Sequence, residues 1–176
     1  MKRIRFTLLI FSVTLLASTM LNARGVYQSR EAFLEETFNG SVPKAEVIWL
    51  SGEIKQHASE ILHHKPNFLR VRYWALGSKS AWVLNEIGKE QPITVGIVIE
   101  NKKIKHLRVL EFRESRGDEV RHPFFTKQFL DVQLEKENQL SKNIDGITGA
   151  TLSVRALKSL ATLALYLDSK RKLKAQ

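Results

Sequence analysis

The sequence predicts a single α+β domain of two layers, in which an antiparallel sheet packs against helices. In residues 92–100, isoleucine and valine alternate with other residues, a period of two that is typical of a strand. Asn101-Lys102 then gives a tight turn before a partner strand at residues 104–112. Residues 151–168 instead place leucine and alanine at helical spacing. The 176 residues, 43% of them hydrophobic, suffice for one domain with a core.

The other elements are predicted from caps, turn residues and prolines. In chain order they are a helix over residues 30–38 capped by Ser29, a strand over 46–50, a helix from Ser51 to about His64 that Pro66 stops, strands over 68–76 and 81–87 joined by Gly77-Ser78, and a short amphipathic helix over 124–130. The closing helix has Leu157, Leu160, Ala164 and Leu167 on one face.

The first 23 residues have the layout of a secretory signal peptide. Lys2, Arg3 and Arg5 precede an apolar run over residues 6–21, and cleavage is expected after Ala23. The alternative is an uncleaved N-terminal anchor. In both cases we expect the domain in the periplasm or on the outer face of the cytoplasmic membrane. The absence of a cysteine at the cleavage site excludes a lipoprotein anchor.

Composition excludes several kinds of redox and metal centre. The chain has no cysteine, which excludes disulfides, thiolate metal sites, iron–sulfur clusters and attached c-type haem. His63 and His64 are adjacent and point to different sides of a helix, so we expect no metal site there. The net charge of +10 favours acidic partners or anionic lipid, although scattered basic residues also serve solubility alone. Export argues against nucleic acid as a partner.

A loop of small residues, from Asp145 to Ala150, leads directly into the closing helix. Gly146 and Gly149 permit left-handed backbone and close approach of a ligand. The first N–H groups of a helix lack internal partners, and together with the helix dipole they form a natural phosphate site. The residues alone leave a second interpretation open, an ordinary helix entry with Thr148 or Thr151 as N-cap. No Gly-Lys-Ser/Thr follows, so the loop is not a P-loop.

The segment Asp145-Gly146-Ile147-Thr148-Gly149-Ala150-Thr151 resembles the acceptor motif of the FMN-binding domain family. The family includes subunits of sodium-pumping quinone reductases and Rnf complexes, and small exported flavoproteins. Its pattern is Asp, two residues, Ser or Thr, Gly, Ala, Thr and usually a further Ser or Thr, here Ser153. The resemblance implies FMN joined to Thr151 through a phosphoester, which a magnesium-dependent flavin transferase makes from FAD. Asp145 and Thr148 would be recognised by the transferase or shape the loop.

The resemblance extends upstream, because residues 94–167 follow the usual order of elements in the family. Glu114-Ser115-Arg116-Gly117 is similar to the Glu-Thr-Pro-Gly segment of the respiratory-complex subunits, from which Ser115 and Arg116 depart. The departure favours a stand-alone carrier. The family layout implies an FMN-binding domain over residues 91–170, followed by a basic tail at 171–176. Residues 24–90 form the N-terminal part of the domain and carry no family signature.

The family layout also places the flavin near residues 117–129. It implies that Arg121 and His122 contact flavin oxygens or stabilise a reduced, anionic ring, and that Phe124 or Phe125 packs on the ring, although phenylalanines in such a segment more often belong to a helix core. The expected cofactor-binding residues are Thr151 as the covalent acceptor, with Asp145, Thr148, Gly149, Ala150, Leu152, Ser153, Glu114, Gly117 and Arg121.

The implied function is electron transfer by covalent FMN, between a membrane reductase or quinol donor and a cytochrome or other acceptor. The implied partners are the flavin transferase and a redox protein, and peripheral association with a membrane fits the basic charge. One alternative is a structural module that binds FMN without a covalent bond or not at all. Another is an extracytoplasmic flavin-dependent reductase with its own substrate.

Overall fold

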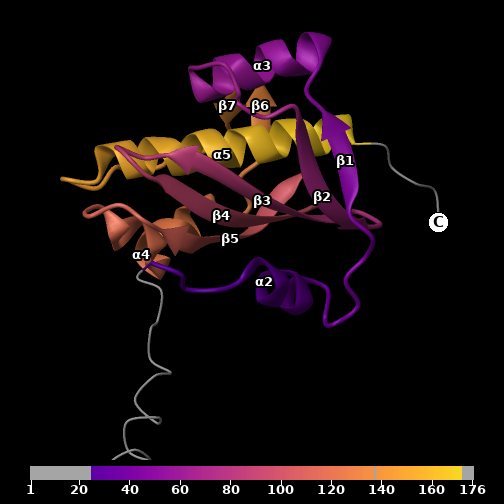
Figure 1. Cartoon of the computed structure of the whole chain (residues 1–176), viewed down its shortest axis with the longest axis horizontal. Coiled ribbons are helices and arrows are strands. Elements are labelled where there is room, and N and C mark those ends of the chain that lie inside the picture. The colour runs from indigo at the N-terminus through magenta and orange to yellow at the C-terminus, as the bar shows by residue number, and fades with distance from the viewer. Residues whose placement is uncertain (1–24, 137, 172–176) are drawn as a thin grey trace, which may run out of the picture.

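Five strands form one antiparallel sheet in which the spatial order is the chain order, β1-β2-β3-β4-β5. The computed structural model describes residues 25–136 and 138–171. The predicted signal segment and residues 172–176 of the predicted basic tail lie outside this part of the chain. Helix α2 covers one face of the sheet, and α5 covers the other with α3 beyond it (Figure 1). The prediction of an α+β domain with an antiparallel sheet and packed helices is confirmed.

Most predicted elements occur, with bounds shifted by at most two residues. The elements are α2 (Arg30–Thr37), β1 (Glu46–Trp49), α3 (Gly52–Leu62), β2 (Arg70–Leu76), β3 (Lys79–Ile87), β4 (Pro92–Glu100), β5 (Lys103–Phe112), α4 (Pro123–Thr126), β6 (Leu134–Lys136), β7 (Gln139–Leu140) and α5 (Thr151–Lys170). The helix predicted over 124–130 is instead the single turn α4 followed by a 3₁₀ turn, Lys127–Phe129. The small β6–β7 pair and a 3₁₀ turn at Asp118–Arg121 were not predicted.

Local chemistry accounts for the helix starts and the tight turns. Ser29 caps α2, because its Oγ accepts a hydrogen bond from the N–H of Ala32 at 3.1 Å. The predicted cap Ser51 does precede α3, but its side chain makes no capping bond. Asn101 and Lys102 both have positive φ, 53° and 63°, as a two-residue hairpin turn of type I′ requires. This turn fixes the register between β4 and β5.

Strand β4 is buried on both faces, but the large aliphatic residues that alternate along it lie on the face toward α5. Ile93, Val95, Ile97 and Ile99 belong to the main core between the sheet and α5. Val98, on the opposite face, packs in a smaller core beneath α2. Gly96 lies on that face too, and a Cβ atom there would stand 2.8 Å from the ring of Phe33. The missing side chain lets α2 approach the sheet.

Helix α5 lies between the sheet and α3 and supplies much of the main core. The face predicted from its spacing, Leu157, Leu160, Ala164 and Leu167, is buried. Burial extends further round the helix because α3 covers the side away from the sheet. Within the described residues, no helix is both long and apolar enough to cross a membrane.

A buried polar network fixes the C-terminal end of α5 to the sheet. Ser80 Oγ donates to Asp168 Oδ1 at 2.5 Å and accepts from Trp82 Nε1 at 2.9 Å. Arg171 Nε donates to the same Asp168 oxygen at 2.8 Å, and the side chains of both residues are 5% exposed. Arg171 also donates to the carbonyl of Gly77 in the β2–β3 turn at 3.2 Å. Removing either ion of a buried pair leaves an uncompensated charge, so this end of α5 is firmly held.

We predict that Gly96→Ala lowers the free energy of unfolding by about 1–3 kcal/mol, because the new methyl group overlaps the Phe33 ring. Chemical denaturation would measure the change. Combining it with Phe33→Leu should cost less than the sum of the two single changes, because the smaller side chain leaves room. Gly146→Ala is the control: no atom lies within 4 Å of its added Cβ, and it should change stability by less than about 0.5 kcal/mol. If the losses in unfolding free energy of the two single variants add exactly in the double variant, the added methyl group does not overlap the Phe33 ring.

Candidate functional site

Helix α5 begins at Thr151, and the residue in the N-cap position is Ala150. The carbonyl of Ala150 accepts from Val154 at 2.9 Å, and its N–H donates to the carbonyl of Ile147 at 3.0 Å. The interpretation in which Thr148 or Thr151 caps the helix is therefore wrong. In the described part of the chain, no side chain caps α5. The Thr151 hydroxyl group is thus not used for capping, and its residue is exposed at the positive end of the helix dipole.

Thr151 lies between two cavities. One, of about 560 Å³, is lined by Lys89, Glu114, Ser115, Arg116 and residues 149–153. The other, of about 430 Å³, lies between α3 and α5, and its lining includes His63, Arg155 and Lys158. Each cavity therefore has two or more basic side chains next to the exposed threonine. This arrangement suits an anionic group attached at Thr151.

Glu114 joins the loop after β5 to the turn between β3 and β4. Its Oε1 accepts from the N–H groups of Lys89, Glu90 and Gln91 at 2.5–2.9 Å. Burial would raise the pKa of Glu114, but these N–H groups together outweigh it and hold the pKa below its ordinary value of 4.5. Glu114 also lines the cavity next to Thr151. By binding the N–H of Lys89, Glu114 holds this residue, which is distant in sequence from the acceptor motif, beside that cavity.

Gly117 brings the same loop against the first turn of α5. Its φ is +88°, and a Cβ atom there would lie 2.7 Å from Ser153 Oγ and 3.5 Å from Ala150 Cβ. A larger residue would therefore both strain the backbone and push the loop away from the helix. Ala150 and Ser153 are buried by this contact, at 3% and 4% exposure. Packing against this loop thus accounts for the small residues Ala150 and Ser153 of the motif.

Asp145 and Thr148 lie in the exposed loop before the helix and do not line either cavity. The backbone N–H of Asp145 donates to Gln128 Oε1 at 2.8 Å, which holds the start of the loop near the turn after α4. Gly149, with φ of +85°, makes the final bend into the helix. The exposed carboxylate and hydroxyl groups of Asp145 and Thr148 are open to a protein that approaches the loop.

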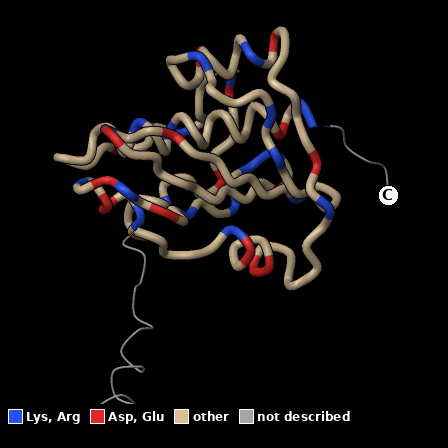
Figure 2. Tube along the Cα trace, viewed as in Figure 1, with Lys and Arg blue, Asp and Glu red and all other residues tan. Residues whose placement is uncertain are grey.

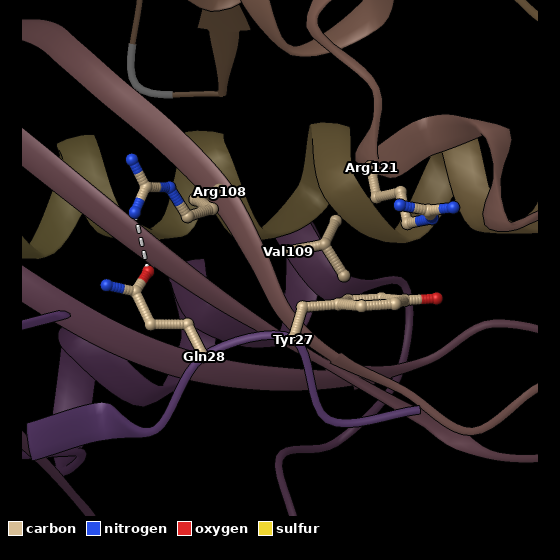
Figure 3. A pocket seen from close by; sticks show the side chains of 5 residues that line it. All are labelled: Tyr27, Gln28, Arg108, Val109 and Arg121. Carbon is tan, nitrogen blue, oxygen red and sulfur yellow. Dashed lines mark hydrogen bonds between the residues drawn. The ribbon is translucent and has the colours of Figure 1, made fainter. Parts of the chain in front are cut away.

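The structure places Arg121 in a different cavity from Thr151. Its guanidinium lies over the Tyr27 ring, 4.7 Å from the centroid, and Nε donates to Asp118 at 3.2 Å. Figure 3 shows the cavity that Arg121 and Tyr27 line, where Arg108 also donates a hydrogen bond to Gln28. Arg121 lines neither of the cavities next to Thr151, and its expected contact with flavin stays a prediction.

The aromatic residues near Arg121 divide between surface and core. Phe124 is 63% exposed and stacks with His122, with ring centroids 6.3 Å apart. Phe125 is fully buried and meets Phe129 edge to face, which is the core role that the sequence left open. Neither phenylalanine lines a cavity next to Thr151.

Sequence reasoning missed the basic residues that line the two cavities. Lys89 arrives through the β3–β4 turn, and Arg155 and Lys158 face outward from α5 at helical spacing. The spacing of Arg155 and Lys158 relative to Thr151 was available in the sequence, because residues three to four apart share a helix face. For Lys89 no local pattern exists, since its position depends on Glu114.

The residues around Thr151 fit a covalently bound flavin phosphate. An exposed hydroxyl residue stands at the first position of a helix, with glycine on one side and basic side chains in both adjacent cavities. Either cavity exceeds 400 Å³, within the range of sites for small ligands and cofactors. When bound, FMN supplies the one- or two-electron chemistry, and the protein supplies the binding site.

We predict that Glu114→Gln destabilises the protein by about 1 kcal/mol at neutral pH, because the three N–H donors prefer a charged acceptor. The folded-state pKa lies below the ordinary 4.5, so the charge contributes fully above that pH and its contribution disappears as pH falls through the folded-state value. Thermal unfolding between pH 7 and pH 3 should show the two proteins converging in acid. Glu35→Gln, at an exposed position on α2, is the control; a constant difference at all pH values would refute the charge effect.

Comparison with known proteins gives one result for this part of the chain. Residues 88–166 match the model of the FMN-binding domain family. No curated protein and no solved structure gives a significant match to the chain. The matched segment begins in the turn held by Glu114 and includes Gly117, the acceptor motif and most of α5. The comparison therefore supports an FMN-binding domain over residues 88–166 of the chain.

Proposed function

We propose that the protein is an exported flavoprotein that carries FMN covalently on Thr151 and passes electrons outside the cytoplasm. The electron donor would be a membrane reductase or a quinol, and the acceptor a cytochrome or another redox protein. The observation that carries the proposal is the place of Thr151. It is exposed, it begins a helix of 20 residues, and it borders two cavities with basic linings.

Attachment requires a flavin transferase that uses FAD. The Thr151 Oγ atom would attack the phosphorus of the FMN half, and a new O–P bond would form as the pyrophosphate O–P bond breaks. AMP would leave, and the hydroxyl proton would pass to a base of the transferase. No electrons change hands in this step. The product is a phosphodiester with one negative charge, which the N–H groups of the first turn of α5 and the adjacent cations can stabilise.

The chain's own residues have separate tasks in this scheme. Gly149 and Gly117 keep bulk away from the acceptor, and Lys89 and Arg116 offset the phosphate charge from one side. Arg155 and Lys158 do the same from the α3 side. Asp145 and Thr148, exposed in the preceding loop, would be contacted by the transferase.

We predict that Thr151→Ala and Thr151→Val abolish covalent flavin attachment in a host with an active flavin transferase. Valine keeps the shape of threonine and removes only the acceptor oxygen. Intact-mass measurement should show the wild type heavier by one FMN less one water. Its fluorescence under ultraviolet light should survive denaturing electrophoresis and should be absent from both variants.

Thr37→Ala is the matched control, because Thr37 lies on α2 across the sheet and its hydroxyl bonds within that helix. It should be flavinylated as fully as the wild type. An unmodified wild-type mass, with the transferase shown to act on another acceptor, would refute covalent attachment. It would favour the alternative of a module that holds FMN without a covalent bond or serves only as a structural subunit.

We predict that chemically reduced, flavin-loaded protein is reoxidised by a cytochrome with an acidic surface. This reaction should become slower by about tenfold or more when the ionic strength is raised from low to high. Salt screens the attraction between the basic residues around Thr151 and the acidic cytochrome. Stopped-flow absorbance would follow both flavin and haem. Steady turnover of a small organic acceptor by the protein alone, without reaction with cytochromes, would instead favour a flavin-dependent reductase.

A further inference from the structure

The sheet divides between β2 and β3. Residues 70–73 of β2 pair with β1, whereas residues 73–76 pair with β3, so the two ladders share only Tyr73. Strand β3 continues through residues 83–87, where it pairs with β4 but not with β2. In Figure 1, β1 and β2 rise toward α3 while β3, β4 and β5 run across the view. The division leaves a cavity of about 490 Å³.

The floor of this cavity is apolar. Leu84 from β3 and Leu160 and Leu163 from α5 line it, and all three belong to the main core. Ile87, at the mouth, is 52% exposed although it is a large aliphatic residue. The three leucines are almost fully buried, so the apolar surface that a ligand can reach comes mainly from Ile87 and the partly exposed Phe68, above the core.

The walls of the cavity carry an excess of positive charge. Arg70 and Arg72 stand two positions apart on β2, so they lie on the same side of that strand, and the Arg70 guanidinium stacks over Trp49 at 5.6 Å. Glu86 is the only acid among the described residues that line the cavity. Its carboxylate is already bound by His64 Nε2 at 3.1 Å and by the N–H of Ile87 at 2.8 Å. The two arginines are therefore in excess over the acids of the lining.

We propose that this cavity binds a small organic anion, a carboxylate with an apolar body. The apolar body would lie against Phe68 and Ile87, over the buried leucines, and the carboxylate would meet Arg70 and Arg72. Arginine binds carboxylates through paired N–H donors, and two such residues on one strand define where the charged end rests. Asn67 and Asn85, also in the lining, add neutral donors near the mouth.

The site is separate from the one at Thr151. None of its lining residues lines either cavity next to Thr151. Leu160 and Leu163 follow Thr151 by nine and twelve residues on α5, which corresponds to roughly 13–18 Å along the helix. The inference thus does not depend on flavin attachment, and the two can fail independently.

Decanoate is a suitable probe, followed by two-dimensional amide NMR of the full-length protein. We expect saturable shifts in residues 70–72, residues 83–87 and the middle of α5, with a Kd on the order of 1 mM for a ligand of this size. Each methylene added between hexanoate and decanoate should strengthen binding about threefold to fourfold. Decyltrimethylammonium, with the same chain and the opposite charge, should not bind.

The double variant Arg70→Gln/Arg72→Gln should weaken decanoate binding about tenfold or more. The matched control Lys102→Gln/Lys103→Gln removes the same charge from the distant β4–β5 turn and should bind as the wild type does. Unchanged amide shifts away from the cavity would show that each variant is folded. Equal binding of the cationic probe, unchanged affinity in the arginine variant, shifts confined to residues 149–153, or no saturable shift would each overturn the proposal.

Discussion

The burial of α5 between the sheet and α3 is the constraint on which the rest of the structure depends. Fourteen of its 20 residues are buried, so packing fixes the position of the helix. The Asp168–Arg171 pair holds one end against the β2–β3 turn, and the contact between Gly117 and Ser153 holds the other. Thr151 is therefore positioned by packing along the whole helix rather than by bonds of its own. An exposed side chain carried by a rigid element is well suited to chemistry, because changing it disturbs little else.

The predictions from sequence succeeded where the relevant pattern is local. Alternation in β4 and helical spacing in α5 each lie within a short stretch of sequence, and the segment that indicated the family lies in consecutive residues. Pairing is not local, so nothing in the β2 sequence indicated that its two halves join different strands. The same limit applies to Lys89, which Glu114 brings to the site, and to Arg121, which stacks on a tyrosine outside any predicted element. The short helix predicted over 124–130 was wrong: the chain makes the single turn α4 and a 3₁₀ turn, and it becomes extended at Leu130.

The net charge of the chain does not show where positive charge gathers on the surface. Acidic and basic residues are interspersed along the trace in Figure 2, and several exposed cations form ion pairs, such as Arg108 with Glu36 and Lys105 with Asp131. Exposed pairs of this kind add little stability and largely cancel at a distance. The positive charge that matters is local: it borders the two cavities at Thr151, and it recurs on β2 beside an apolar floor. The two regions differ in shape and composition, which argues for different ligands.

The position of α5 after the sheet in the chain order has a consequence for the order of events during biosynthesis. Strands β1–β5 precede α5, so the main-core face of the sheet stays open until α5 has been made and can cover it. Contacts between elements so distant in sequence form late, and a partly made chain exposes its apolar strands meanwhile. Thr151 is the first residue of this helix. Any modification of Thr151 that needs the folded loop and helix must therefore follow the synthesis of α5, and it would mark chains in which the sheet is already covered.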